Sequence, residues 1–483
     1  MISIEQCVWN RASLHPDKVA VKSGKDCVTY RELCRKICAA RNYFMALENY
    51  SPRKVVLLAA NKQIGFVYAY FGAHMAGLTV VPIDAETNPA RFDLITKAVA
   101  PFCVAGFDKA LGCWQNVSLK DFDKIEGVES DIDEFPDMDA VADILFTTGT
   151  TGTPKGVPLT FKNEAAAARN INAFIRNSSD DTELLALPIS HSFGLGRVRC
   201  ALSNGQTIIL LGSFANVKRI FKSIEEEGVS GFSMVPSGWK FLQKMSGNKL
   251  GEYADRLKYI EMGSAYFSEN DKRELANLLP NTRVTMHYGL TEASRSAFME
   301  FHEDDRFLNS VGKPSPFTDI QVFDENGKML PAGAEGEIAV KGEHVTQGYL
   351  GNVASDNFFG EYFRTGDWGA KNADGYIFLK SRKKELINVG GKKVSPVEVE
   401  TELNKIPCIE ESACIAVPDP EGVLGEVVKA CLVKKSSEPE MSFAEIASLL
   451  TGKIESYKMP AIYEWIDAIP KTSNGKIQRG LLK

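Results

Sequence analysis

The sequence predicts an α/β protein with two parts: a large N-terminal domain of mainly parallel sheets with helices and a β-rich subdomain, and a small α+β C-terminal domain. Three observations lead to this. The chain has 483 residues, too many for one ordinary core but enough for a large and a small domain. Apolar residues make up 44% and charged residues 24%, which is a globular composition. Short β-rich runs also alternate with helical stretches through most of the chain.

The expected strands of the large domain are short apolar runs bounded by turns. They fall at 55–59, 80–83, 144–147, 207–211, 259–262 and 283–286. Helices are expected between them, at 163–175 and 268–279. The second opens with Ser268, and Asp271 follows three residues later in a capping pattern.

The pattern of expected secondary structure changes after about residue 310. Runs at 320–323, 336–340 and 375–379, separated by Gly, Asn and Pro turns, indicate antiparallel β structure. From Val394 onward a compact unit of about a hundred residues is expected. Its predicted order is a helix at 396–404, strands at 409–417 and 427–433, and a helix at 443–455. We therefore predict a core domain over 1–381, a hinge at 382–384 and a C-terminal domain over 385–483.

Composition excludes several classes of protein. The chain carries 56 basic and 62 acidic residues, a net charge of −6, which argues against a nucleic-acid partner. Ten cysteines occur without a CxxC pair, so neither a zinc site nor a disulfide framework is expected. The N-terminus lacks the pattern of an export signal, and a cytoplasmic protein is expected. Residues 65–84 lack Lys and Arg, but His74, Gly77 and Pro82 interrupt them. They predict a buried helix, a glycine turn and a strand ending at Pro82, not a membrane span.

The strongest local signal is residues 146–156, FTTGTTGTPKG, directly after a predicted strand. Glycines let the backbone approach a ligand closely, threonine hydroxyls can donate to oxygens, and the lysine adds a fixed positive charge. A plain surface turn explains this run poorly. The loop does not match the Walker pattern, which requires Gly before the lysine and Ser or Thr after it, because Pro154 precedes Lys155 and Gly156 follows it. We predict that the loop holds a polyphosphate, with contacts from Thr147, Thr148, Gly149, Thr150, Thr151, Gly152 and Lys155.

This loop, together with several later segments, resembles the adenylate-forming superfamily of acyl-CoA synthetases, peptide-synthetase adenylation domains and luciferases. Matching segments run in the family's order from Val19 to Lys476, nearly the whole chain, and look closest to acyl- or aryl-acid–CoA ligases. The resemblance implies a nucleotide site built around residues 286–292, MHYGLTE, in which Tyr288 stacks on adenine, Thr291 contacts the α-phosphate region and Glu292 holds magnesium. A carboxylate in a loop after a buried strand also suits a hard cation. The remaining predicted ATP-binding residues here are Gly263, Ser264, Ala265, His287 and Gly289.

Two further segments match the family. In residues 363–367, FRTGD, the resemblance implies that Asp367 accepts hydrogen bonds from both ribose hydroxyls, which suits an ionised carboxylate. In residues 375–398 it implies that Arg382 also reaches the ribose, that Lys384 is the hinge of a mobile C-terminal domain, and that Gly390 and Gly391 border the tunnel for the thiol. Two departures from the family pattern, Ser381 and Asn388, lie where a pantetheine arm would pass.

The last match is residues 470–479, PKTSNGKIQR, in which Lys476 resembles the family's adenylation lysine. As a carboxylate attacks the α-phosphorus, negative charge builds on two reacting groups at once. An ammonium between them stabilises that transition state more than the ground state. We predict Lys476, Thr291 and His191 as the catalytic residues, with Lys155 on the leaving phosphates.

The acid is expected to contact residues 187–197, LPISHSFGLGR, which resemble the Pro-x-x-His-x-x-Gly stretch of acyl and aryl ligases. We predict an apolar slot formed by Phe193 and Gly194, with His191 as a gate near the carboxylate. No acidic residue occurs between Leu184 and Phe221 to pair with an α-ammonium group, so a fatty, aryl or other non-amino acid is favoured. Arg197 is either a surface charge or a partner for a second polar group on the acid.

The sequence therefore predicts an enzyme that uses ATP and Mg²⁺ to make an acyl-adenylate and then transfers the acyl group to a thiol, most simply coenzyme A. One alternative is a stand-alone enzyme that loads an acyl carrier protein on its phosphopantetheine. Another is a non-catalytic nucleotide-binding relative, disfavoured by the intact Lys155, Glu292, Asp367, Arg382 and Lys476. A luciferase-type oxygenase has no separate support.

Overall fold

The structure, a computed structural model, describes residues 1–61, 63–107, 115–129, 132–147, 154–212, 214–351, 355–439, 441–471 and 477–482. The chain divides into two compact units. Unit 1 comprises Met1–Asp319 and Val340–Asn357, and unit 2 comprises Ile320–Ala339 and Phe358–Lys483. The predicted fold class, α/β with a β-rich region and a small C-terminal α+β region, is confirmed. The predicted boundary at 382–384 stays a prediction.

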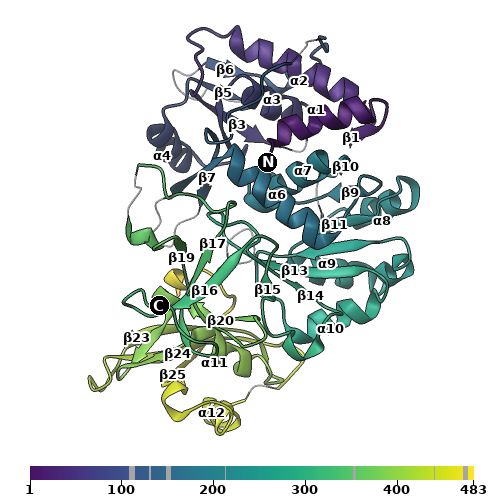
Figure 1. The fold of residues 1–483 in the computed structure, drawn as a ribbon. Coiled ribbons are helices and arrows are strands. Elements are labelled where there is room, and N and C mark those ends of the chain that lie inside the picture. Colours follow the sequence, from purple (N-terminus) through teal and green to yellow (C-terminus); the bar gives the residue numbers. More distant parts are fainter. Residues whose placement is uncertain are drawn as a thin grey trace. The chain divides into compact units, whose positions relative to one another are not determined.

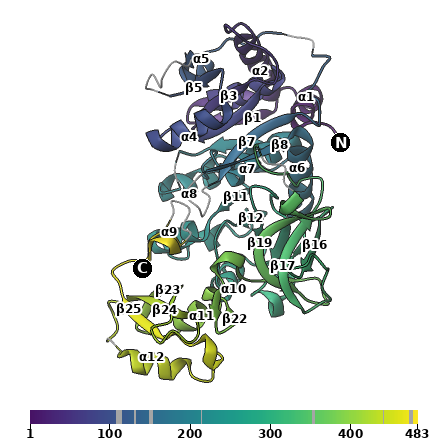
Figure 2. The ribbon, with the colours of Figure 1, turned by 90° about the vertical axis from the view of Figure 1, so that its left-hand side faces the viewer.

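Unit 1 contains two mixed sheets, labelled in Figures 1 and 2. In the described residues the first has six strands, in the order β6 (Gln115–Val117), β5 (Cys103–Ala105), β3 (Val55–Ala60), β4 (Thr79–Asp84), β7 (Val141–Thr147) and β8 (Lys155–Thr160). The second has nine, in the order β15 (Lys313–Pro314), β14 (Ala297–Glu300), β13 (Arg283–Tyr288), β12 (Tyr259–Met262), β11 (Gly231–Met234), β9 (Thr182–Leu185), β10 (Thr207–Leu210), β1 (Val19–Ser23) and β2 (Asp26–Thr29).

The central strands of both sheets pair in parallel, and the antiparallel pairs lie at the edges. Helices cover the strands, as parallel sheets require. The helices of unit 1 are α1 (Ile4–Leu14), α2 (Tyr30–Met45), α3 (Ile64–Met75), α4 (Pro89–Val99), α5 (Leu119–Asp123), α6 (Phe161–Ile175), α7 (Ser192–Asn204), α8 (Val217–Glu226), α9 (Pro236–Ser246) and α10 (Glu269–Leu278). Among the described residues no helix is long and apolar enough to cross a membrane.

The helix α7 is fixed by two buried arginines that reach different sheets. Arg197 donates to Glu183 of β9, in the nine-stranded sheet, with Nε 2.6 Å from Oε1. Arg199 pairs with Asp143 of β7, in the six-stranded sheet, and with Glu164 of α6 at 2.8 Å. Residues two apart on a helix point to nearly opposite sides, so this one helix ties both sheets together.

Unit 2 carries smaller sheets. A five-stranded sheet holds β16 (Asp319–Phe323), β17 (Glu335–Lys341), β19 (Tyr362–Lys371), β18 (Phe358–Phe359) and β20 (Ile377–Arg382). A hairpin of β21 (Ile387–Val389) and β22 (Lys392–Val394) follows. The remaining elements are α11 (Pro396–Leu403), β23 (Ile409–Pro418), β24 (Glu426–Lys434), α12 (Phe443–Leu450) and β25 (Ile462–Trp465).

Several predicted element ends differ from the structure, and two of these differences have a local cause. The strand expected to stop at Pro82 continues to Asp84, because Pro82 still pairs with Leu58 of β3. The last helix, expected to reach residue 455, ends at Leu450, because Gly452 adopts a left-handed conformation with φ 79°. By contrast, Ser268 caps α10 as predicted, since its hydroxyl accepts from the backbone N–H of Asp271.

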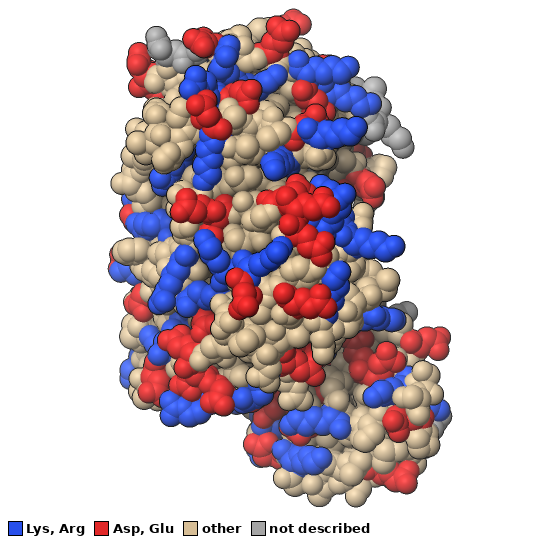
Figure 3. All heavy atoms as spheres, turned by 90° about the vertical axis from the view of Figure 1, so that its right-hand side faces the viewer, with Lys and Arg blue, Asp and Glu red and all other residues tan. Residues whose placement is uncertain are grey.

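The surface carries charges of both signs. On the face shown in Figure 3, Lys and Arg side chains are interspersed with Asp and Glu side chains. This mixture matches the near balance of 56 basic and 62 acidic residues in the sequence.

Candidate active site

The predicted phosphate loop joins β7 to β8. Thr147 and Lys155 are cross-strand partners at the end of this antiparallel pair. The strands therefore bring the two ends of the loop together. The predicted contacts in its middle, at Thr148, Gly149, Thr150, Thr151 and Gly152, lie outside the described residues.

The predicted phosphate lysine and the predicted magnesium ligand both contact one tyrosine. Lys155 is exposed, and its Nζ lies 4.8 Å from the centre of the Tyr349 ring. The Tyr349 hydroxyl donates to Oε1 of Glu292 at 2.8 Å. Glu292 is only 9% exposed, so this hydrogen bond to a carboxylate fixes its orientation. A cation and an acid are thus held together through a residue that the sequence analysis missed.

The chain between Thr346 and Leu350 holds this arrangement in place. The Thr346 N–H donates to the Glu292 carbonyl at 2.8 Å, and its hydroxyl donates to the Pro158 carbonyl at 2.6 Å. The Leu350 N–H donates to the Gly156 carbonyl at 2.9 Å. The segment therefore links the loop of Glu292 to the strand that begins with Lys155. An aromatic residue directly after a glycine was the only hint of it in the sequence.

The predicted adenine tyrosine ends a buried strand. Tyr288 is the last residue of β13, is 7% exposed and pairs with Ala297 of β14. The chain then turns sharply. Glycine is required at Gly289, because a Cβ there would overlap the backbone of Arg295. The half-buried Thr291 lies in this turn, next to Glu292.

The predicted adenine turn, Gly263, Ser264 and Ala265, directly follows β12. Ser264 has a φ of 72°, a left-handed conformation that is uncommon for a residue with a side chain. Such backbone strain is concentrated at ligand sites. A Cβ at Gly263 would overlap the imidazole of His287, so the turn packs directly against that ring.

His287 belongs to a buried ionic cluster. Its Nδ1 lies 2.6 Å from Oε1 of Glu261, which also accepts from Arg295 Nε at 3.2 Å. Arg197 Nη1 lies 3.4 Å from the second oxygen of Glu261. Burial alone would raise the pKa of Glu261, but Arg295, His287 and Arg197 hold it well below its usual range. Burial lowers the pKa of His287; Glu261 opposes this effect, and Arg295 and Arg197 add to it.

This cluster settles the question left open for Arg197. The residue is neither a surface charge nor free to meet a substrate, because it is fully buried and donates to Glu183. Glu183 lies directly before the segment between Leu184 and Phe221 that lacks acidic residues, and Glu261 lies further along the chain. Both carboxylates are buried partners of Arg197.

The predicted acid-pocket residues lie at the start of α7. His191 is the half-buried N-cap residue of this helix. The Phe193 ring meets the His287 ring edge-on, with centroids 4.6 Å apart at 88°. Gly194 lets the helix approach Pro188, because a Cβ there would overlap the Pro188 carbonyl. The predicted acid pocket and the predicted nucleotide site therefore meet at His287.

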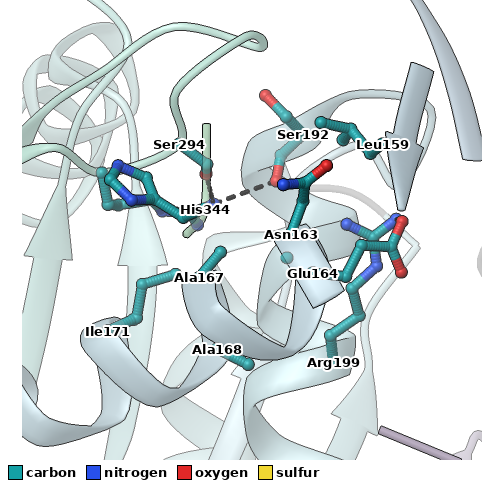
Figure 4. A pocket seen from close by; sticks show the side chains of 12 residues that line it. Leu159, Asn163, Glu164, Ala167, Ala168, Ile171, Ser192, Arg199, Ser294 and His344 are labelled. Atoms are coloured by element: carbon teal, nitrogen blue, oxygen red, sulfur yellow. Dashed lines mark hydrogen bonds and ion pairs between the residues drawn. The ribbon is translucent and has the colours of Figure 1, made fainter. Parts of the chain in front are cut away.

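A separate small pocket lies on the other side of α7, between that helix and α6 (Figure 4). Glu164 and Arg199 form one wall, and His344 closes the opposite end. The Nε2 of His344 lies 3.1 Å from the Ser296 hydroxyl, and burial lowers its pKa to about 4. The remaining lining residues are Leu159, Asn163, Ala167, Ala168, Ile171, Ser192, Gly196, Ser294 and Arg295.

In unit 2 the two predicted ribose residues are cross-strand neighbours on β19 and β20. Arg382 Nε lies 2.9 Å from Asp367 Oδ1, and its Nη1 donates to the Thr365 carbonyl at 2.9 Å. The Asp367 N–H donates to the Thr365 hydroxyl at 3.0 Å. The Asp367 carboxylate is therefore oriented by its ion pair with Arg382.

The predicted hinge and thiol-tunnel residues follow directly. Lys384 lies in a single 3-10 turn, Lys383–Glu385. Lys383 Nζ lies 3.0 Å from Glu337 of the five-stranded sheet. Gly390 and Gly391 form the two-residue turn of the β21–β22 hairpin, both with positive φ, as a tight hairpin turn requires.

The predicted catalytic lysine, Lys476, lies outside the described residues, as do 472–475. The ends of its loop are described: Lys471 and Ile477 form an antiparallel bridge. Two residues after that bridge, Arg479 donates to both oxygens of Glu400 of α11, at 2.7 and 2.8 Å.

Comparison with known proteins agrees with this geometry. Residues 8–350 match the model of the AMP-binding enzyme family, and residues 398–476 match the model of the AMP-binding enzyme C-terminal domain. Feruloyl-CoA synthase from Amycolatopsis is 29% identical over 97% of this chain and 96% of its own. 2-Succinylbenzoate–CoA ligase from Staphylococcus aureus is 27% identical over 98% and 99%. The crystal structure of ATP-bound MatB from Rhodopseudomonas palustris superposes with a TM-score of 0.89, at 25% identity, over 99% and 98%.

The chain belongs to the AMP-binding enzyme family, within the adenylate-forming superfamily. The predicted class of enzyme, an AMP-forming acid–thiol ligase, is likewise confirmed.

Proposed function

We propose that the protein activates a non-amino carboxylic acid with ATP and Mg²⁺ to an acyl-adenylate, releases pyrophosphate, and transfers the acyl group to coenzyme A. The observation that carries this proposal is the arrangement of Lys155, Tyr349 and Glu292 beside the phosphate loop. It places a fixed cation and an oriented carboxylate next to each other, as binding of a metal–polyphosphate requires.

The nucleotide is bound in three parts. Lys155 and the hairpin loop hold the β- and γ-phosphates. Tyr288 and the turn at Ser264 contact the adenine. Asp367 accepts from the ribose hydroxyls, and its ion pair with Arg382 supports this role by orienting the carboxylate.

Glu292 fits a magnesium ion that also binds substrate phosphates better than it fits a metal ion coordinated by protein side chains alone. One of its oxygens accepts from Tyr349, so the other can face a cation. Among the described residues no group of three or more His, Cys, Asp or Glu could hold a metal. Magnesium is commonly held by one or two carboxylates, waters and substrate phosphates, so the donor set fits. When bound, the ion supplies neutralisation of phosphate charge during the displacement.

Two steps follow. A carboxylate oxygen of the acid attacks the α-phosphorus, and the bond from this phosphorus to the bridging oxygen breaks, so pyrophosphate leaves. The thiolate of coenzyme A then attacks the acyl carbon, and AMP leaves with the electrons of the anhydride bond. Lys476 acts in the first step, where its ammonium stabilises charge on both reacting groups.

The central test is acid-dependent exchange of labelled pyrophosphate into ATP, with a panel of aromatic, fatty, hydroxy and amino acids. Aromatic acids belong in the panel because two relatives are named for feruloyl and 2-succinylbenzoate. We expect exchange that needs Mg²⁺ and a non-amino acid. Exchange driven only by amino acids, or no exchange and no AMP with any acid, contradicts the proposal. Competition between coenzyme A and carrier proteins after adenylation identifies the acceptor.

A further inference from the structure

The segment of residues 343–350, which runs past the predicted magnesium ligand, is also bound from the start of α6. The side-chain amide of Asn163 donates both of its hydrogens to this segment. One goes to the carbonyl of Glu343 at 2.8 Å and the other to the carbonyl of Val345 at 2.9 Å. Asn163 is only 8% exposed, and a buried carbonyl without a donor is costly. These two hydrogen bonds therefore restrain the first part of the 343–350 segment.

The direction of the Asn163 side chain is set by the way α6 begins. Its Oδ1 accepts from the backbone N–H of Thr160 at 2.9 Å, and its own N–H donates to the Thr160 hydroxyl at 3.1 Å, which forms a capping box. Thr160 is the last residue of β8, and Lys155 is the first. The strand that carries the predicted phosphate lysine thus also fixes the amide that binds the 343–350 segment.

From Val345 the restraint reaches Glu292 in one step. Val345 forms an antiparallel β-bridge with Ala293, the residue that follows Glu292. The Thr346 N–H donates to the Glu292 carbonyl at 2.8 Å, and the Tyr349 hydroxyl donates to the Glu292 carboxylate at 2.8 Å. The same segment therefore holds both the main chain and the side chain of the predicted magnesium ligand.

Other contacts restrain this end of the segment less. Asn163 and His344 both line the small pocket of Figure 4, so side-chain packing is incomplete here. The His344 ring pairs with Ser296, which lies beyond Glu292 on the same loop and does not reach α6. The carboxylate of Glu343 pairs with cations of α6, the nearest being Arg169 at 3.1 Å, but these pairs are partly exposed and such pairs contribute little. The amide of Asn163 is therefore the main buried link between α6 and this end of the segment.

We propose that Asn163 is a positioning residue for the magnesium carboxylate: through the 343–350 segment it holds Glu292 in the orientation that binds magnesium together with the ATP phosphates. This inference rests on the role of Glu292 in the proposed function. Asn163 acts through the segment and not on the nucleotide. Its loss therefore weakens binding of ATP in the presence of Mg²⁺ and spares binding of ATP alone.

The test is calorimetric titration of ATP into the enzyme, in excess EDTA and over a range of Mg²⁺ concentrations, without acid or coenzyme A. Asn163→Ala leaves two carbonyls without their donor. It should raise the dissociation constant of ATP at limiting Mg²⁺ about tenfold and leave the value in EDTA within about twofold of wild type. A purely structural role would change both values together.

Asn172→Ala is the matched control, because Asn172 also lies on α6 and its amide donates to a carbonyl, that of Cys200, at 3.0 Å. It should leave the magnesium dependence unchanged. Thr346→Val is the second variant. It removes the hydroxyl that donates to the Pro158 carbonyl at 2.6 Å and keeps the backbone N–H on Glu292, so it should weaken magnesium-dependent binding in the same way.

A folded Asn163→Ala enzyme with the magnesium dependence of the wild type overturns the inference. So does an equal loss of ATP affinity in EDTA, an equal effect of Asn172→Ala, or a wild-type ATP affinity that does not depend on Mg²⁺. If Asn163→Ala does not fold, Thr346→Val decides by the same criteria. The proposed function is decided separately by acid-dependent pyrophosphate exchange, which the wild type can show whether or not Asn163 has this role.

Discussion

The hydroxyl of Tyr349 offers a direct test of how the magnesium carboxylate is positioned. Tyr349→Phe removes the 2.8 Å hydrogen bond to Glu292 and keeps the ring beside Lys155. The variant therefore separates the orientation of the carboxylate from the contact with the lysine.

The expected effect can be estimated from the geometry. A hydrogen bond to a charged group contributes about 1.5–3 kcal/mol. Glu292 is nearly buried, so water replaces the lost hydroxyl poorly and the upper part of this range applies. Since about 1.4 kcal/mol is a factor of ten, acid-dependent exchange at limiting Mg²⁺ should fall roughly 10- to 100-fold. Part of the loss should be recovered at high Mg²⁺, because the carboxylate itself remains.

The assay is pyrophosphate exchange as a function of Mg²⁺ concentration. Tyr50→Phe is the control, because its hydroxyl donates to the carbonyl of Ala76 at 2.6 Å, in the region of α3. It should leave the magnesium dependence unchanged. A Tyr349→Phe enzyme within about twofold of wild type at every Mg²⁺ concentration would refute the positioning role assigned to this hydroxyl.

Three further predictions follow. Lys476→Ala should slow adenylation about 10²–10⁴-fold but largely spare thioester formation from preformed acyl-adenylate, and equal loss of both half-reactions contradicts the assignment. Arg479→Gln leaves Glu400 buried without its guanidinium partner and should lower the midpoint of thermal unfolding. It should also slow adenylation more than thioester formation. If both half-reactions keep their wild-type rates, the Arg479–Glu400 pair does not position the loop of Lys476. Burial alone would lower the pKa of His74, but hydrogen bonds to Asp143 and Glu5 raise it to about 10. A folded-state pKa above the unfolded value of about 6.5 stabilises the fold fully below pH 6.5, and this stabilisation is lost as pH rises toward 10. The free energy of unfolding, from urea titrations, should therefore fall between pH 7 and 9.5 by at most about 1.4 kcal/mol per pH unit, and His74→Asn should flatten this dependence.

The parts of the fold that local chemistry determines could be predicted from the sequence. The strand at 259–262 matches β12 to the residue, because a short apolar run between turns has few other solutions. The cap of α10 at Ser268 follows for the same reason, since the hydroxyl needs only its own first turn. The turn at Gly390 and Gly391 also depends on two adjacent residues, but the sequence analysis assigned these glycines to the thiol tunnel and predicted no hairpin there.

Contacts between distant segments could not be predicted. Tyr349 lies 57 residues from Glu292 in sequence, and no periodicity links them. Arg197 and Glu261 meet only because α7 packs beside β12, so the sequence left the role of Arg197 open. Which side of a helix faces which sheet is a property of the packed fold, and ionic partners follow from it.

The position of α7 does not depend on His287. Arg197 on one side and Arg199 on the other anchor the helix through Glu183 and Asp143, so its position does not depend on the histidine. Glu261 would keep both arginine partners if the imidazole were removed, so no buried charge would be left alone. The ring nevertheless forms part of the wall next to Phe193. Replacement of His287 should therefore leave the ionic cluster around Glu261 paired.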